Sequence, residues 1–304
     1  AFYFKTMTHK TDLISIVMPV YNAARFLPAC LQSIKAQTHK NWELIAVDDH
    51  SKDNSLAILK KFAKSDKRVK VYANPRNLGA SSTANLAISR AKSKFIARMD
   101  ADDIMYPTRL AQQLKTLQTH PSVVVLGSQC DLIDASGHRT GKKLFPTCPK
   151  NIFDMLFWAC PVQQPTIMVN TNRLPDGFRW YADGVKTGEE INFLIRISKY
   201  GSIVNSKKTF LSYRIHANNL SYNQNQKRVF FNLFKTRLST VLSGHYKPSI
   251  GSLILGFSEV LIVSLIPGRM VMPLFQLLRG MKDFSFNLKL PAIFPNQRAV
   301  RFSA

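Results

Sequence analysis

The chain has 304 residues and carries 42 lysine and arginine residues against 18 aspartate and glutamate residues, a net charge of +24 at neutral pH. Its hydrophobic content of 45% and charged content of 20% are those of a globular protein, which excludes a disordered chain. The excess of positive charge indicates an anionic partner, and nucleic acid, anionic lipid and phosphorylated substrates all satisfy that requirement.

The N-terminal residues 1–12 contain no long apolar run, so we expect a tail rather than a signal peptide. The cysteines are scattered, without a C-x-x-C pair or zinc-finger spacing, at Cys30, Cys130, Cys148 and Cys160. This usage is typical of reduced thiols in a cytosolic protein.

The segments that follow the tail alternate between two patterns. Apolar runs typical of buried strands lie at residues 13–22, 44–47, 69–74 and 95–100. Amphipathic segments typical of helices lie between them, at residues 23–41, 55–66 and 79–92. This βαβαβαβ order predicts an α/β domain with a mainly parallel sheet, and the length allows one large domain plus an extension.

Polar residues follow three of these strands. They are Pro19 to Tyr21, then Asp48 and Asp49, then Asp100, Asp102 and Asp103. In such sheets ligands bind beyond the carboxyl ends of the strands, so we expect these residues to lie close together. Carboxylates packed this closely repel one another unless a cation lies among them, which predicts a divalent metal at residues 100–103.

The sequence contains neither G-x-G-x-x-G nor G-x-x-x-x-G-K-[ST]. Binding of phosphate by a glycine-rich loop is therefore unsupported. A nucleotide diphosphate could instead be neutralised by a hard divalent cation, held by one or two carboxylates and the phosphate oxygens.

The stretches SIVMPVYNAARFLPACLQSIKAQTHKNWELIAVDDHSKDNS and MDADDIMYPTRL resemble the family 2 glycosyltransferases, the large inverting group with the GT-A fold. The resemblance runs in order over residues 13–220. It implies a GT-A catalytic domain at residues 1–222, of bacterial cell-surface polysaccharide or glycolipid type. Its implied donor is a nucleoside-diphosphate sugar, with a UDP-sugar favoured, and its implied acceptor is a hydroxyl of a glycan or a lipid-linked molecule.

The resemblance also implies roles around the nucleotide. Pro19 and Tyr21, in the loop after the first strand, flank the base. Asp49 hydrogen-bonds the base, typically uracil, and Asp48 supports the loop. Asn85 lies where the family often has an Arg-Asn pair, although the preceding residue here is alanine.

Asp100 and Asp102 match the D-x-D pair of the family. Asp102 is the implied direct ligand of Mn²⁺ or Mg²⁺, and Asp100 lies nearer the ribose. The stretch LSYRIHANNLS resembles the closing Tyr-Arg-x-His segment, which implies that His216 contacts the diphosphate or the metal, with Arg214 close by. Asp103 leaves two interpretations open, support of the site or a cap of the following helix.

The stretch TGEEINFLIRISKYG resembles the segment whose second acid is the catalytic base. Alignment on Arg196 places Glu190 at that position, one methylene longer than the usual aspartate, with Glu189 as its neighbour. A metal on Asp102 would stabilise the leaving diphosphate, and Glu190 would take the proton of the acceptor, so that the anomeric carbon inverts. The alternative is an ordinary acidic first helical turn.

Residues 223–304 form a basic and apolar extension, in which 11 lysine and arginine residues against two acids give +9. Its apolar stretch at 250–266 is short for a spanning helix of about 20 residues and contains Glu259. We therefore expect two proline-separated helices that lie in the membrane interface, with lysine and arginine on anionic headgroups. A helical hairpin packed on the catalytic domain, or a dimer contact, remains open.

Together these features predict a cytoplasmic protein, peripheral on the inner face of the cell membrane, with no nucleic acid partner; a homo-oligomer is left open. Two other functions are alternatives to a glycosyltransferase. A nucleotidyltransferase usually has a glycine-rich basic loop after its first strand, and PVYNAARF contains no glycine. A catalytically inactive, glycosyltransferase-like membrane adaptor would have no reason to keep Asp49, Asp100, Asp102 and Glu190.

Overall fold

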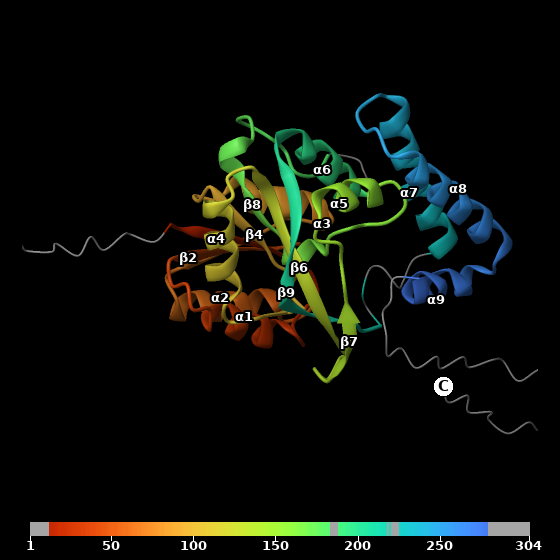
Figure 1. The fold of residues 1–304 in the computed structure, drawn as a ribbon. Coiled ribbons are helices and arrows are strands. Elements are labelled where there is room, and N and C mark those ends of the chain that lie inside the picture. Colours follow the sequence, from red (N-terminus) through yellow and green to blue (C-terminus); the bar gives the residue numbers. More distant parts are fainter. Residues whose placement is uncertain (1–11, 183–187, 218, 220–224, 279–304) are drawn as a thin grey trace, which may run out of the picture.

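The computed structural model describes residues 12–182, 188–217, 219 and 225–278, and its main domain is a sheet flanked by helices (Figure 1). The first elements are β1 (Ile14–Val20), α1 (Leu27–Lys35), β2 (Trp42–Asp48), α2 (Ser55–Ser65), β3 (Val69–Ala73), α3 (Ala80–Ser89) and β4 (Phe95–Arg98). The predicted alternation of strand and helix is confirmed.

The chain then becomes less regular. Its next elements are β5 (Ile104–Met105), α4 (Arg109–Thr119), β6 (Val123–Ile133), β7 (Arg139–Lys143), α5 (Pro149–Met155), β8 (Met168–Asn170), α6 (Glu189–Ile197) and β9 (Ser202–Arg214). Short 3-10 helices lie between them at η1 (Gln164–Thr166), η2 (Thr171–Arg173) and η3 (Ser198–Tyr200).

The strands form one sheet in the order β3-β2-β1-β4-β8-β6-β9-β5, with β7 beside β6. The neighbouring strands β3, β2, β1 and β4 are all parallel to one another, and β6 is parallel to β9. β5, β7 and β8 are antiparallel to theirs, so the sheet is mixed. The parallel part is the part that brings β1, β2 and β4 to a common carboxyl edge.

Both faces of the sheet are covered. Helices α1, α2 and α4 pack on one face, and α3, α5 and α6 pack on the other (Figure 1). In β1, Ile16 and Met18 face the first layer while Val17 faces the second. This burial on both sides explains why the strand is a continuous apolar run.

Three helices follow the sheet domain and pack beside it (Figure 1): α7 (Gln226–Leu242), α8 (Ile250–Leu265) and α9 (Gly268–Leu278). Pro267 separates α8 from α9, as the sequence predicted, and Pro273 lies inside α9. Arg237 of α7 donates a hydrogen bond to the Trp158 carbonyl of the domain (3.2 Å). Within the described residues, no helix combines the length and apolar character that crossing a bilayer requires.

Candidate active site

The loops that carry the predicted site residues lie side by side beyond β1, β2 and β4. Val20 is aligned with Asp48 across β1 and β2, and Val17 with Arg98 across β1 and β4. Past the strand ends, the Asp49 N–H donates to the Val20 carbonyl (2.7 Å). The strand order therefore produces the convergence that the sequence predicted.

The end of β1 differs from expectation in one detail. Pro19 lies inside β1, aligned with Val47 of β2, and not in the loop after the strand. A proline fits at a strand position where no ladder donor is required. Tyr21 does lie in the loop, and 48% of its surface is exposed, which leaves its ring available to a flat ligand.

Asp48 and Asp49 are both buried but have different partners. Asp49 accepts hydrogen bonds from the Asn74 side chain (2.8 Å) and from the N–H groups of Leu78 (2.8 Å) and Gly79 (2.9 Å). Asp48 accepts only the Ser51 N–H, through Oδ2 (3.0 Å). Its Oδ1 atom is buried without a hydrogen-bond partner among the described residues. Asp49 thus fixes the loop before α3, whereas Asp48 retains an acceptor.

Asp100 pairs with a buried arginine. Arg98 Nη2 lies 2.9 Å from Asp100 Oδ1, and Arg98 is only 4% exposed. Burial lowers the pKa of Arg98, but the interactions with Asp100 and Tyr181 together outweigh burial, so its pKa is raised. Burial raises the pKa of Asp100, and Arg98 opposes that rise. The pair explains how a carboxylate is held in so acidic a loop.

Asp102 and His216, the two predicted metal ligands, are brought together from distant parts of the chain. His216 Nε2 lies 2.9 Å from Asp102 Oδ2. The imidazole ring packs on Phe26, with 4.6 Å between ring centroids. Both side chains remain partly exposed, so a ligand can reach them.

Asp103 supports the Asp102–His216 pair through a hydrogen bond to the backbone of Arg214. Its Oδ1 atom accepts the Arg214 N–H (2.8 Å), and its Oδ2 atom is buried without a partner in the described part of the chain. Burial raises the pKa of Asp103 well above its usual range. Helix α4 begins only at Arg109, with Thr108 at its N-cap. The helix-cap interpretation of Asp103 is therefore wrong, because the N-cap residue, Thr108, lies five positions after Asp103.

Arg214 lies beside Asp102, and its guanidinium donates to backbone carbonyls of two loops. Its Nε atom donates to the Asp102 carbonyl (2.8 Å) and its Nη1 atom to the Asp134 carbonyl (2.9 Å). Its guanidinium lies over the Phe26 ring, 4.8 Å from the centroid. Arg214 thus positions the Asp102 loop.

Glu189 and Glu190 begin α6, directly after Gly188, whose φ of 81° suits glycine. Both the acidic-turn and the catalytic interpretation are compatible with this position. Burial, and next the charges of Glu189 and Asp100, raise the pKa of Glu190 to about 7. Burial also raises the pKa of Glu189.

Asn85 points to a neighbouring loop. Its Nδ2 atom donates to the Tyr181 carbonyl (2.7 Å), and its Oδ1 atom accepts the Tyr181 N–H (3.2 Å). The side chain therefore holds the backbone at Tyr181, which leaves a direct nucleotide contact as a prediction.

The residues fit a divalent metal that is shared with a phosphate ligand. Asp102 and His216 supply one carboxylate and one imidazole, and Asp103 adds an orphaned buried oxygen nearby. A hard cation completed by phosphate oxygens needs no more protein ligands than these. The described residues contain no cluster of three or more His, Cys, Asp or Glu side chains suited to a metal.

A cavity of about 590 Å³ adjoins this pair. It is lined by Asn22, Arg25, Phe26, Lys52, Asp53, Ala135, His216 and Ala217. Two hydrogen bonds fix its walls, from Lys52 N–H to Asn22 Oδ1 (2.8 Å) and from Ala24 N–H to Asp53 Oδ2 (2.9 Å). Arg25 and Lys52 contribute two positive charges to its lining, and Asp53 contributes one negative charge.

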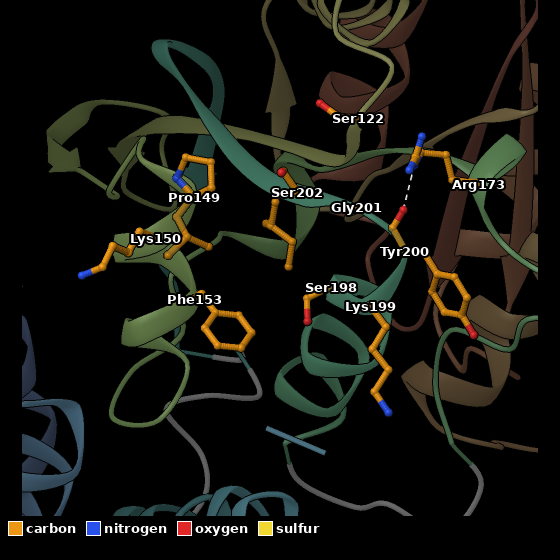
Figure 2. Close-up of a pocket in the computed structure, with 12 residues that line it drawn as sticks. Ser122, Pro149, Lys150, Phe153, Arg173, Ser198, Lys199, Tyr200, Gly201 and Ser202 are labelled. Carbon is orange, nitrogen blue, oxygen red and sulfur yellow. Dashed lines mark hydrogen bonds between the residues drawn. The ribbon is translucent and has the colours of Figure 1, made fainter. Parts of the chain in front are cut away.

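A second cavity, of about 550 Å³, lies at the amino ends of β6 and β9, far from these loops in the strand direction (Figure 2). Figure 2 shows Phe153 and Ser198 facing its interior, and Arg173 held by the Tyr200 carbonyl (2.7 Å). None of the predicted site residues lines it.

The sequence analysis did not predict two buried side chains near the loop of residues 100–103, namely Arg109 and Tyr181. Arg109 is fully buried, donates to the Arg98 and Ile167 carbonyls (2.9 and 3.2 Å), and its pKa is lowered by burial to about 9. Tyr181 is also fully buried, beside Arg98. Arginines that flank MDADD within an apolar segment were an available signal; nothing local pointed to Tyr181.

Comparison with known proteins gives a consistent result. Residues 15–173 match the family model described as glycosyl transferase family 2. A glycosyltransferase of Haemophilus influenzae is 28% identical over 225 residues, which cover 70% of this chain and 69% of that protein. The glycosyltransferase GlyG of Streptococcus pneumoniae is 35% identical over 128 residues, 42% of each chain. The chain spans 30 to 34% of the length of three Rickettsia relatives.

Two solved structures share the fold. S. aureus TarS 1–349 in complex with UDP-GlcNAc superimposes with a TM-score of 0.60 at 20% identity, over 74% of this chain and 66% of the TarS 1–349 chain. The mannosyltransferase PcManGT of Pyrobaculum calidifontis, in complex with GDP-Man and Mn²⁺, gives a TM-score of 0.56 at 14% identity, over 88% and 85%.

Proposed function

The chain belongs to glycosyl transferase family 2, and from this premise we propose that it is a metal-dependent inverting glycosyltransferase. Its donor is a nucleoside-diphosphate sugar, with a UDP-sugar favoured, and its acceptor is a hydroxyl of a glycan or lipid-linked molecule. The observation that supports the proposal is that Asp102 and His216 lie 2.9 Å apart and that Glu190, whose pKa is raised to about 7, lies within the electrostatic influence of Asp100.

The leaving group is stabilised on the side of Asp102. A bound Mn²⁺ or Mg²⁺ supplies Lewis-acid stabilisation of the departing diphosphate. Asp102 and His216 would hold that ion, and Arg25 and Lys52 in the lining of the adjoining cavity add positive charge for phosphate oxygens. Asp103 and Arg214 keep the Asp102 loop in place.

The base is recognised at the tips of β1 and β2. The exposed Tyr21 ring offers a surface for stacking. Of the two neighbouring carboxylates, Asp48 has a buried acceptor, Oδ1, without a partner among the described residues, while Asp49 accepts hydrogen bonds from Asn74, Leu78 and Gly79. We therefore propose that Asp49 also supports this loop, and that Asp48 Oδ1 is a second candidate, beside Asp49, for the contact with the base.

Glu190 activates the acceptor. A general base works best when its pKa lies near the working pH, and burial brings the pKa of Glu190 to about 7. Its carboxylate takes the acceptor proton as the hydroxyl attacks the anomeric carbon opposite the diphosphate, which inverts the configuration. Neither a covalent intermediate nor a nucleophilic side chain is required.

Release of nucleoside diphosphate from a sugar nucleotide tests the proposal. The assay uses UDP-glucose, UDP-GlcNAc and GDP-mannose with Mn²⁺, before and after chelation. We expect release by the wild-type protein to depend on the metal, and Asp102→Asn and Glu190→Gln each to lower it by about a hundredfold or more. Asp154→Asn, which removes a carboxylate paired with Lys150 on α5, is the control and should keep the wild-type rate.

The same assay separates the rival functions. An inactive adaptor would release no nucleotide from any donor and would not respond to Asp102→Asn. A nucleotidyltransferase would instead produce pyrophosphate from a nucleoside triphosphate and a sugar phosphate. Either result would overturn the proposal.

We also propose that residues 1–222 form the catalytic domain and that residues 223–304 contact an anionic membrane surface, on its cytoplasmic side. The support is a stripe of exposed apolar side chains on α8, made of Ile250, Ile254, Phe257, Leu261 and Leu265. Their spacing places them on one helix face, and Lys247 and Arg269 flank the helix. A lipid-linked acceptor would be reached from this surface.

A further inference from the structure

Phe26 directly precedes α1, at the N-cap position of this helix. Side chains that accept a hydrogen bond are preferred at an N-cap, and a hydrocarbon ring cannot accept one. The apolar cores formed by the described residues do not include Phe26, although they include the next residue, Leu27. Phe26 is instead half-buried and lines the cavity that adjoins His216. Neither helix capping nor core packing therefore explains a phenylalanine at this position.

The neighbours of the Phe26 ring are an imidazole and two guanidinium groups. The His216 ring centroid lies 4.6 Å from that of Phe26, with 38° between the ring planes. The guanidinium carbons of Arg214 and Arg25 lie 4.8 and 5.2 Å from the Phe26 centroid. Aromatic pairs and cations over an aromatic ring attract each other at such separations. One ring thus contacts both a predicted metal ligand and the arginine that positions the Asp102 loop.

The contact with Phe26 restricts a rotation that the backbone at His216 leaves open. Asn219 accepts the His216 N–H (2.5 Å) and donates to the Arg214 carbonyl (3.1 Å), which fixes the backbone of this turn. These bonds do not determine the rotation of the imidazole about its Cβ–Cγ bond, which has only a broad preference of its own. Packing on Phe26 limits this rotation and so helps to keep Nε2 at 2.9 Å from Asp102 Oδ2.

The same contact does not depend on what Nε2 binds. A cation held by both His216 Nε2 and Asp102 Oδ2 would replace the direct contact between these two atoms. The packing on Phe26 uses the face of the imidazole ring and not Nε2, so it would persist. Loss of a group that orients a ligating histidine typically weakens metal binding by about ten- to a hundredfold.

We propose that Phe26 is a positioning residue for the donor side of the site. Its ring holds the His216 imidazole, and with it the Arg214 guanidinium, in the orientation that a divalent cation and a diphosphate require. This inference rests on the proposed role of Asp102 and His216 as metal ligands. It predicts that metal-dependent binding of a nucleotide requires an aromatic ring at position 26, although this ring supplies no ligand atom.

The test separates metal-dependent from metal-independent binding. Calorimetry measures the Kd of UDP, or of GDP where GDP binds more tightly, once with Mn²⁺ and once with EDTA. In Phe26→Leu the Kd with Mn²⁺ should rise by about tenfold, while the Kd with EDTA stays within about twofold of wild type. Phe26→Tyr keeps the aromatic ring and should match wild type under both conditions. His216→Ala removes the ligand itself and should lose affinity only with Mn²⁺.

Phe62→Leu is the matched control. Phe62 is a half-buried phenylalanine of α2 whose ring packs on the apolar core, so this variant loses a ring without a change around His216. It should bind the nucleotide like wild type under both conditions. Circular dichroism checks that each variant is folded, and Phe26→Met supplies a second side chain without a ring if Phe26→Leu does not fold.

The outcomes distinguish this inference from the proposed function. If a folded Phe26→Leu or Phe26→Met matches wild type with Mn²⁺, while His216→Ala binds more weakly, the inference is wrong and the proposed ligand stands. If Phe26→Tyr loses as much affinity as Phe26→Leu, the aromatic ring is not what orients His216, and the inference is again wrong. If Mn²⁺ does not tighten binding to wild type, or His216→Ala keeps the wild-type gain, the proposed metal ligation is wrong and the inference fails with it.

Discussion

The environment of Glu190 favours its proton. Burial, Glu189 and Asp100 together outweigh Lys143 and Arg98, and its pKa is raised to about 7. That value suits a general base, but it also means that the folded protein holds the carboxylate charge at a cost above neutral pH. A side chain under selection for stability alone would not be placed in this way.

This cost predicts how stability changes when the charge is removed. The pKa of Glu190 is raised on folding, so its favourable contribution is complete below pH 4.5 and is lost as the pH rises through about 7. Glu190→Gln should therefore unfold at a temperature higher by about 2 °C or more at pH 8.5, and at the wild-type temperature at pH 5. Calorimetry at the two pH values measures this; a variant that is less stable at pH 8.5 would contradict the burial argument.

The neighbouring carboxylates Asp48 and Asp49 differ in the hydrogen bonds that they accept from the protein. The Asp49 carboxylate accepts from Asn74 and from the Leu78 and Gly79 N–H groups. In Asp49→Asn an amide NH₂ must face one of these donors, so we expect a loss of about 1 to 3 kcal/mol in urea denaturation. Asp48→Asn should lose less, because Oδ1 has no described partner. Equal losses would contradict the loop-support assignment of Asp49.

The acidic residues of this site could be predicted from the sequence, but of their partners only His216 and Arg214 could, through the family resemblance. Asp100 and Asp102 follow an apolar strand at once, and this local pattern placed them at the sheet edge. The position of Tyr181 beside Arg98 depends on how β8, η1 and α6 pack, which no local periodicity records. The helix-cap interpretation of Asp103 was wrong for a related reason, since its partner Arg214 comes from β9.

Secondary structure shows the same division. Strands β1 to β4 and the helices between them have strong periodicity, and their order determined the parallel half of the sheet. The insertion of the three-residue β8 between β4 and β6 depends on pairing between segments about seventy residues apart. Short strands of this kind have too few side chains for an alternating pattern to be recognised.

Gly256 of helix α8 allows the C-terminal extension to pack closely on Phe157 of the sheet domain. A Cβ atom at Gly256 would lie 2.5 Å from Phe157 Cε1, whereas one at Gly251 would meet nothing within 4 Å. Gly256→Ala should therefore force α8 or Phe157 to move and cost about 1 to 3 kcal/mol, although alanine favours a helix. Gly251→Ala, the matched control, should be neutral or slightly stabilising.

Thermal unfolding together with limited proteolysis between α7 and α8 distinguishes these two variants. Faster cleavage and a lower midpoint are expected for Gly256→Ala alone. If both variants match wild type, α8 is not held against the domain through Phe157.

Charge and apolar surface coincide in the C-terminal part of the protein. The net charge of the chain is +24, residues 223–304 contribute +9 of it, and the apolar side chains of the α8 stripe are exposed. Exposed apolar area of this kind on a soluble surface is unfavourable unless something covers it. Basic residues beside it favour anionic lipid headgroups, while a second copy of the chain would bring further positive charge.

Vesicle binding decides between these two coverings. We expect the wild-type protein to sediment with vesicles that contain phosphatidylglycerol, less so with pure phosphatidylcholine, and less at 0.5 M salt than at 0.1 M, because salt screens the attraction to headgroups. Ile254→Gln combined with Leu261→Gln removes two of the most exposed side chains of the stripe and should weaken binding by about tenfold or more. Leu144→Gln, at a comparably exposed leucine just after β7, is the control and should bind like wild type.

A different outcome would overturn the membrane proposal. If the wild-type protein does not bind vesicles but elutes as a dimer, and the variant with the changed stripe elutes as a monomer, the stripe is a protein interface.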